Sequence, residues 1–151
     1  MFRLRYGCVV GVLALTSLAS VSQPAASTSC AQWNVSGTWK VTQHASAISP
    51  LYHVTFRLTQ SGKTVTGQGI LTKAEAKASA YTGTVGKLKG TVSGSHLSLA
   101  VTWPPLTDGR VPKGTYVAAV SAGAMSGQAW AVTQPTVKIA WDARGQARCV
   151  R

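Results

Sequence analysis

Alternation of apolar and polar side chains, repeated between turns, constrains this 151-residue chain more than any other feature. Every second residue from Tyr52 to Leu58 is apolar, and the intervening residues are His53, Thr55 and Arg57. A period of two is typical of a β-strand with one buried face. The pattern predicts about eight or nine strands, in the segments Gly37–Gln43, Tyr52–Gln60, Thr64–Thr72, Thr82–Ser93, His96–Trp103, Thr115–Ser121, Ser126–Thr133, Thr136–Trp141 and Gln146–Arg151.

No segment shows a sustained helical period, so no helix is expected to cover the apolar face of the sheet. Residues Glu75–Ala80 fit a short helical turn at most, without a good cap. An uncovered sheet can bury its apolar face by closing on itself. Glycines within strands relieve crowding and let strands bend in a small barrel, and they occur at Gly67, Gly69, Gly90 and Gly127. The sequence predicts an all-β, antiparallel up-and-down barrel of about eight strands over residues 33–151.

The N-terminus has the layout of an export signal. Arg3 and Arg5 precede an apolar run from Tyr6 to Leu18. Ser20–Ser22 fits a small-x-small cleavage site, and Ala25–Ser27 is a second option. The run is short for a bilayer span, which disfavours the alternative of an uncleaved anchor. We predict a signal peptide at 1–22, a flexible leader at 23–32, no membrane span in the mature chain, and a secreted or periplasmic location.

Two cysteines, Cys30 and Cys149, remain after Cys8 leaves with the signal. An even pair in an exported protein predicts a disulfide. Free thiols are less favoured in an oxidising compartment, and a metal site is less favoured because nothing nearby supplies further ligands. A disulfide requires its two Cα atoms to lie within about 4.4–6.8 Å. The first and last ordered segments should therefore be neighbours, with the disulfide closing the barrel near the termini.

The charge balance disfavours catalysis. The chain has 15 Lys and Arg against 3 Asp and Glu, for a formal charge of +12. Its carboxylates are Glu75, Asp108 and Asp142, and a paired-carboxylate hydrolase would need two of them to meet. His44, His53 and His96 lack metal-ligand spacing, with His53 and His96 predicted to face solvent. We predict no enzyme, no metal and no cofactor.

The basic residues are expected to coat the outside of the barrel, most densely at Lys87–Lys89 and Arg144–Arg151. Such a coat keeps a protein soluble and also attracts anionic envelope polymers. Specific nucleic-acid binding is not expected, because readers of single strands use exposed aromatic side chains, whereas the alternation places the aromatics inside.

Aromatic residues gather on the predicted inward faces, at Trp39, Tyr52, Phe56, Trp103, Tyr116, Trp130 and Trp141. They either fill the barrel or line a cup for a small apolar ligand, since a barrel of this size allows both. In the second case Gln43 and Gln128 would supply polar contacts. The candidate ligand-binding residues are Trp39, Gln43, Tyr52, Phe56, Trp103, Tyr116, Gln128 and Trp130.

The Gly-x-Trp run at Gly37–Trp39 resembles the first strand of lipocalins and avidins, and Val65–Gly67, Val101–Trp103 and Gly114–Val117 are similar to later avidin strands. The resemblance implies a small calycin-type barrel. It does not imply biotin binding, because Val41 and Gly69 stand where avidins have Asn and Tyr, and Asp142 lies in a predicted turn. Lipocalins also stack a late basic residue on the first Trp, which would be Arg144 or Arg148 here.

Together these features predict a secreted binding or interaction module without catalysis, holding a small apolar ligand in the barrel mouth. The alternative is an interaction through the surface: with an anionic envelope polymer through the basic coat, or with a secreted protease, as its inhibitor, through the long loop Pro104–Lys113.

Overall fold

The structure is a computed structural model that describes residues 30–44 and 52–150. The predicted signal peptide and all but the last three residues of the predicted leader lie outside the described residues.

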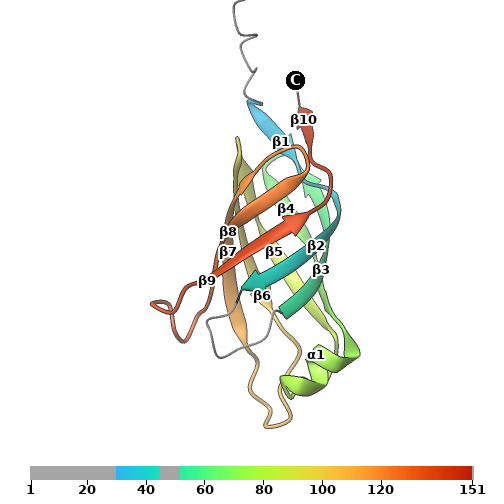
Figure 1. The fold of residues 1–151 in the computed structure, drawn as a ribbon, viewed down its shortest axis with the longest axis vertical. Coiled ribbons are helices and arrows are strands. Elements are labelled where there is room, and N and C mark those ends of the chain that lie inside the picture. The colour runs from blue at the N-terminus through green and yellow to red at the C-terminus, as the bar shows by residue number, and fades with distance from the viewer. Residues whose placement is uncertain (1–29, 45–51, 151) are drawn as a thin grey trace, which may run out of the picture.

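Eight antiparallel strands form a closed barrel, which confirms the predicted fold class (Figure 1). Each strand pairs with the next along the chain, and the last pairs with the first to close the barrel. The strands are β2 (Gly37–His44), β3 (Tyr52–Ser61), β4 (Thr64–Leu71), β5 (Val85–Ser93), β6 (His96–Thr102), β7 (Lys113–Val120), β8 (Ala124–Ala131) and β9 (Ile139–Arg144).

The seam of the barrel is made by β2 and β9, and not by the last strand of the chain. Lys40 to His44 pair with Arg144 to Ala140 along this seam. Asp142 therefore lies inside a strand, and its assignment to a turn was wrong. The residues after Gly145 leave the barrel, and β10 (Arg148–Val150) pairs with β1 (Gln32–Asn34) in a separate two-stranded ribbon.

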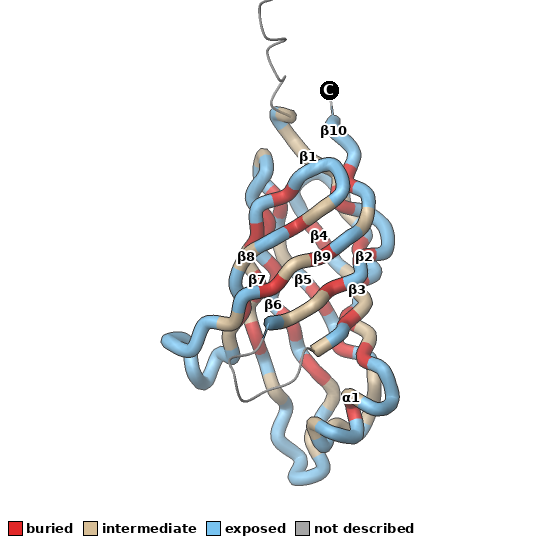
Figure 2. The backbone as a smooth tube through the Cα atoms, in the orientation of Figure 1, coloured by how far each residue is buried: buried red, intermediate tan, exposed pale blue. Residues whose placement is uncertain are grey.

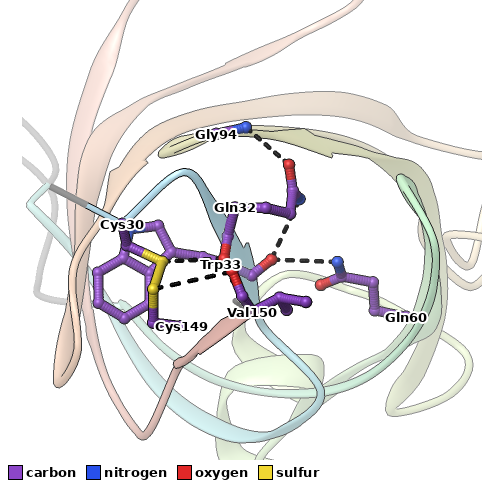
Figure 3. Close-up of a disulfide and its surroundings, with 7 residues drawn as sticks. All are labelled: Cys30, Gln32, Trp33, Gln60, Gly94, Cys149 and Val150. Atoms are coloured by element: carbon purple, nitrogen blue, oxygen red, sulfur yellow. Dashed lines mark hydrogen bonds between the residues drawn. A yellow bond between two sulfur atoms is a disulfide. The ribbon is translucent and has the colours of Figure 1, made fainter.

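The disulfide between Cys30 and Cys149 joins the two strands of this ribbon (Figure 3). Its Cα atoms are 5.5 Å apart although the cysteines are separated by 119 residues. The prediction that the terminal segments are neighbours joined by a disulfide is thus confirmed. The disulfide lies in the ribbon at one end of the barrel, and the seam itself is formed by β2 and β9. Such a bond indicates an oxidising, extracytoplasmic compartment.

Two glutamines attach the ribbon to hairpins of the barrel (Figure 3). The Gln60 side chain accepts a hydrogen bond from the Val35 backbone N–H at 2.8 Å and donates to the Trp33 carbonyl at 3.1 Å. The Gln32 side chain accepts from the Gly94 N–H at 2.9 Å. Because backbone groups buried without partners are costly, these bonds hold the ribbon against this end, which we call the closed end.

A short helix, α1 (Lys73–Ala78), follows β4 and lies at the opposite end of the barrel from the ribbon (Figure 1). It has a capping box, in which the Thr72 hydroxyl accepts from the Glu75 N–H and the Glu75 carboxylate accepts from the Thr72 N–H. The expectation that nothing caps this segment was therefore wrong, since Thr72-x-x-Glu75 fits the known signature.

Glycines let paired strands approach closely at three matching positions. A Cβ atom at Gly67, Gly90 or Gly127 would collide with the carbonyl oxygen of Arg57, Ser98 or Val117, respectively, on the neighbouring strand. Each glycine lies in register with the residue that follows that carbonyl. The prediction that glycines relieve crowding in the strands is confirmed at these positions.

Apolar side chains fill the barrel, where buried residues alternate with exposed ones along the strands (Figure 2). Trp39 and Phe56 are fully buried, and Trp141 is 2% exposed. Phe56 and Tyr116 meet edge to face with centroids 5.2 Å apart, and Tyr116 meets Trp141 at 5.5 Å. We call Phe56, Tyr116 and Trp141 the aromatic cluster. It lies in the barrel interior, where it takes up room that a ligand would need.

Candidate functional site: the open end of the barrel

The end opposite the ribbon, which we call the open end, carries α1 and the connections 103–112 and 132–138 (Figure 1). A pocket of about 180 Å³ lies there. It is lined by Gln43, Tyr81, Trp103, Pro112, Lys113, Gly114, Tyr116, Ala129, Trp130, Ala131 and Ile139. We call this the mouth pocket. It brings together four of the predicted ligand-binding residues, namely Gln43, Trp103, Tyr116 and Trp130.

A hydrogen-bonded pair supplies the polar part of the mouth pocket. The Gln43 side-chain amide donates to the Tyr116 hydroxyl oxygen at 2.5 Å. Burial raises the pKa of Tyr116 well above its usual value, so its hydroxyl keeps its proton. Among the described residues no hydrogen bond donated by this hydroxyl is present. An O–H donor next to an amide is the kind of polar pair that fixes the orientation of a bound molecule.

Trp103 and Tyr81 supply the aromatic wall of the pocket. Their rings lie 6.1 Å apart, and Trp103 is largely buried. The Trp103 indole lies against Gly69 and Gly86, where a Cβ atom would come within 3.0 and 2.6 Å of the ring. The two glycines face each other in register on β4 and β5. Their missing side chains therefore leave the space that the indole ring occupies.

Tyr81 was not singled out from the sequence, because it lies between α1 and β5, in a segment without strand periodicity. An isolated bridge pairs it with Leu106 in the loop 103–112. Burial raises the pKa of Tyr81 to about 12. Its ring packs partly buried against the core, and it extends the aromatic wall beyond Trp103.

The alternation in β8 is opposite to the predicted one. Met125 and Ala129 are buried, so Gln128 and Trp130 alternate outward. Gln128 is exposed, whereas Trp130 is half-buried, with the Lys138 ammonium 3.3 Å from its ring centroid. Two inward positions are small: a Cβ atom at Gly127 would collide with the Val117 carbonyl, and Ala129 pairs with the large Tyr116 across the sheet. Trp130 still borders the mouth pocket from its rim.

Three further candidates lie outside the mouth pocket. Trp39 lies near the closed end, where its indole N–H donates to the Val35 carbonyl at 2.9 Å. Phe56 belongs to the aromatic cluster. The Tyr52 hydroxyl lies 3.2 Å from the Ser79 hydroxyl at the end of α1, and partial burial raises its pKa.

The resemblance to lipocalins predicted a basic side chain stacked on Trp39. Instead, Gly145 lies there, and a Cβ atom at this position would come within 2.5 Å of the Trp39 ring. Arg144 and Arg148 are exposed on β9 and β10. The close packing of backbone on indole leaves no room for a guanidinium at the Gly145 contact.

One buried donor of the interior has no partner. The Trp141 indole N–H is the single buried side-chain nitrogen or oxygen atom without a hydrogen bond among the described residues. Its ring contacts Tyr116. Burying such a group without a partner costs free energy, so the aromatic cluster would gain from an acceptor brought within reach.

Each side-chain carboxylate of the chain is engaged elsewhere. Glu75 caps α1, and Asp108 accepts from the Arg110 guanidinium at 2.7 Å. This bond holds the pKa of Asp108 below its usual value. Asp142 binds His44 at 2.5 Å on the outer face, and both side chains are partly exposed. The three carboxylates thus meet in no pair.

His53 and His96 are exposed, as predicted. Within residues 30–44 and 52–150 no group of three or more potential metal ligands is found. No helix in this part of the chain is long and apolar enough to cross a membrane.

Comparison with known proteins gives no relative: no family model, no curated protein and no solved structure matches this chain. The fold is an eight-stranded closed antiparallel barrel, consistent with a calycin-like architecture.

Proposed function

We propose that the protein is an exported, non-catalytic binding module that holds a compact ligand in the mouth pocket. The observation that carries this proposal is the Gln43–Tyr116 hydrogen bond beside the aromatic wall of Trp103 and Tyr81. An apolar pocket with a few convergent polar groups is the usual form of a small-molecule site.

The size of the pocket defines the class of ligand. Its 180 Å³ is below the roughly 300–1,000 Å³ of sites for drug-sized ligands. The aromatic cluster closes the interior beyond it. The ligand should therefore be a single small ring with one hydrogen-bond acceptor, which receives the Tyr116 O–H while the ring lies against Trp103.

The resemblance to lipocalins and avidins supports the same proposal, since those families also use the inside of the barrel. We also propose that the protein is related to these families and that an N-terminal signal directs its export. The predicted inhibition of a protease through the loop 104–113 stays a prediction. Within that loop Asp108 and Arg110 bind each other, and the Leu106 N–H donates to the Arg110 carbonyl.

The proposal is tested by titrating ¹⁵N-labelled protein with acetophenone, which carries one acceptor, and with ethylbenzene, its apolar analogue. Acetophenone should shift the Trp103 indole and Gln43 side-chain amide signals, and it should bind more tightly than ethylbenzene. Tyr116→Phe should weaken acetophenone binding about 2- to 10-fold, the value of one hydrogen bond. Tyr52→Phe is the matched control, because its hydroxyl lies near Ser79 instead.

Two results together would overturn the proposal. One is that neither probe shifts these signals. The other is that native mass spectrometry of protein purified from its own host shows no retained small molecule. The aromatic residues would then serve only to fill the barrel. Equal binding of both probes, unaffected by Tyr116→Phe, would refute the role of the polar pair.

A further inference from the structure

A row of cations crosses the outer face of the barrel on alternate strands. Arg57 on β3, Lys87 on β5 and Lys113 on β7 lie in one cross-strand register, separated by Gln68 on β4 and Thr102 on β6. All five side chains are exposed. Because adjacent strands lie about 4.8 Å apart, successive cations of the row are about 10 Å apart. We call these five residues the basic row.

Four of the five residues of the basic row line a hollow in the barrel surface, and Lys113 lies beyond its edge. A depression of about 840 Å³ is lined by Arg57, Gln68, Lys87, Lys89, Thr66 and Thr102, among others. Lys89 follows Lys87 on the same face of β5, about 7 Å farther along the strand. The cations of the hollow thus extend both across the strands and along β5, with hydroxyl and amide groups between them.

No side-chain carboxylate neutralises this charge. The only three in the chain are Glu75, Asp108 and Asp142. Glu75 caps α1, Asp108 pairs with Arg110, and Asp142 pairs with His44. An uncompensated row of one sign attracts an anionic partner and accelerates its association.

We propose that the basic row binds an extended acidic polysaccharide, laid across the strands with its acidic groups on Arg57, Lys87 and Lys113. The guanidinium and ammonium groups would bind the carboxylates. Gln68 and Thr102 would bind the sugar hydroxyls between them. The row runs across five strands without interruption, which favours a linear chain over a single small anion.

The lining of the hollow disfavours other polyanions. Binding of single-stranded nucleic acid relies on aromatic side chains that stack on the bases, and the hollow contains none. Insertion into a lipid surface relies on exposed large apolar side chains, and its only large apolar residues, Leu58 and Leu88, belong to the buried core. The hollow is separate from the mouth pocket, although Lys113 at the end of the basic row also borders that pocket. The proposal does not depend on the ligand proposed for the mouth pocket.

The test measures binding of a defined-length oligogalacturonate to the oxidised protein by titration calorimetry at low and at physiological salt. Neutral dextran and a thymidine oligonucleotide of equal charge are measured beside it. The triple variant Arg57→Gln, Lys87→Gln and Lys113→Gln removes the row. The control variant Lys63→Gln, Lys73→Gln and Arg148→Gln removes the same charge from exposed positions outside it.

We expect the row variant to bind oligogalacturonate about tenfold more weakly than wild type, as three partly screened ion pairs would give. The control variant should lose less than about threefold, and Tyr116→Phe should bind like wild type. Added salt should weaken wild-type binding. If the row variant does not fold, Lys87→Gln compared with Lys63→Gln gives the same contrast.

Three results would overturn the proposal. Equal losses in the row and control variants would mean that net charge alone attracts the polymer. Tighter binding of the oligonucleotide would make the partner class wrong. Absence of binding to oligogalacturonate at low salt would remove the site altogether.

Discussion

Removal of the disulfide should destabilise the whole barrel, although the bond lies in the ribbon. In the chain-entropy description, the disulfide limits the conformations of a 119-residue loop in the unfolded chain. Its removal lets the unfolded chain gain entropy, which lowers the free energy of unfolding by about 5 kcal/mol. The full effect is expected only if the ribbon unfolds together with the barrel. Gln60 and Gln32 couple the two, through hydrogen bonds to Val35, Trp33 and Gly94.

The double variant Cys30→Ala, Cys149→Ala is therefore expected to lose about 4–5 kcal/mol of unfolding free energy and to melt roughly 15 °C lower. Urea unfolding followed by tryptophan fluorescence measures this loss, since Trp39 and Trp141 are buried. Wild type in reductant should behave like the variant. A loss below about 1 kcal/mol would refute the reasoning, because the ribbon would then separate from the barrel before the barrel unfolds.

Three smaller perturbations test other parts of the structure. Gly67→Ala should cost about 1–3 kcal/mol in urea unfolding through its collision with Arg57, and Gly83→Ala, with only ordinary contacts, should cost little; equal effects would contradict the close approach. Thr72→Ala should cost about 1 kcal/mol through loss of the α1 cap, whereas Thr107→Ala should be neutral in the same assay. Folding raises the pKa of Tyr81 from 10.0 to about 12, so this residue favours the folded state below pH 10 and loses that contribution as the pH rises through 12. Tyrosinate absorbance should then show ionisation of Tyr81 well above pH 10 in the folded protein, and titration at its ordinary value would be the contrary result.

The period-two pattern predicted the strands well where one face is clearly apolar, as in Tyr52 to Leu58. It failed in β8, where it predicted that Trp130 faces inward, although Met125 and Ala129 are the buried residues. Gly127 lies where a Cβ atom would collide with the Val117 carbonyl, and Ala129 pairs with the large Tyr116 across the sheet. Which face of β8 points inward depends on the sizes of side chains on the neighbouring strands, and the sequence of β8 alone does not contain this information.

The end of the chain shows a second limit. The disulfide required the terminal segments to be neighbours, which is correct, but closure of the barrel by those segments did not follow. Asp142 and Gly145 read locally as a turn, yet pairing with both β2 and β8 keeps residues 139–144 in a strand. Tertiary pairing thus outweighs local turn preference.

The candidate site was only partly readable for a similar reason. Gln43, Trp103 and Tyr116 were found because they continue inward faces of predicted strands. Tyr81 was missed because its place at the mouth depends on the path between α1 and β5. The alignment of Arg57, Lys87 and Lys113 depends on strand register, which their positions in the sequence do not give.

The central claim is that β2 and β9 close the barrel around a packed aromatic interior. Cross-strand nuclear Overhauser effects between Val41 and Ala143 test it most directly, since these residues face each other across the seam. A closed barrel predicts these contacts, together with a slowly exchanging Trp141 indole proton. Their absence, with a rapidly exchanging indole, would show an open sheet and contradict both the closed barrel and the mouth pocket.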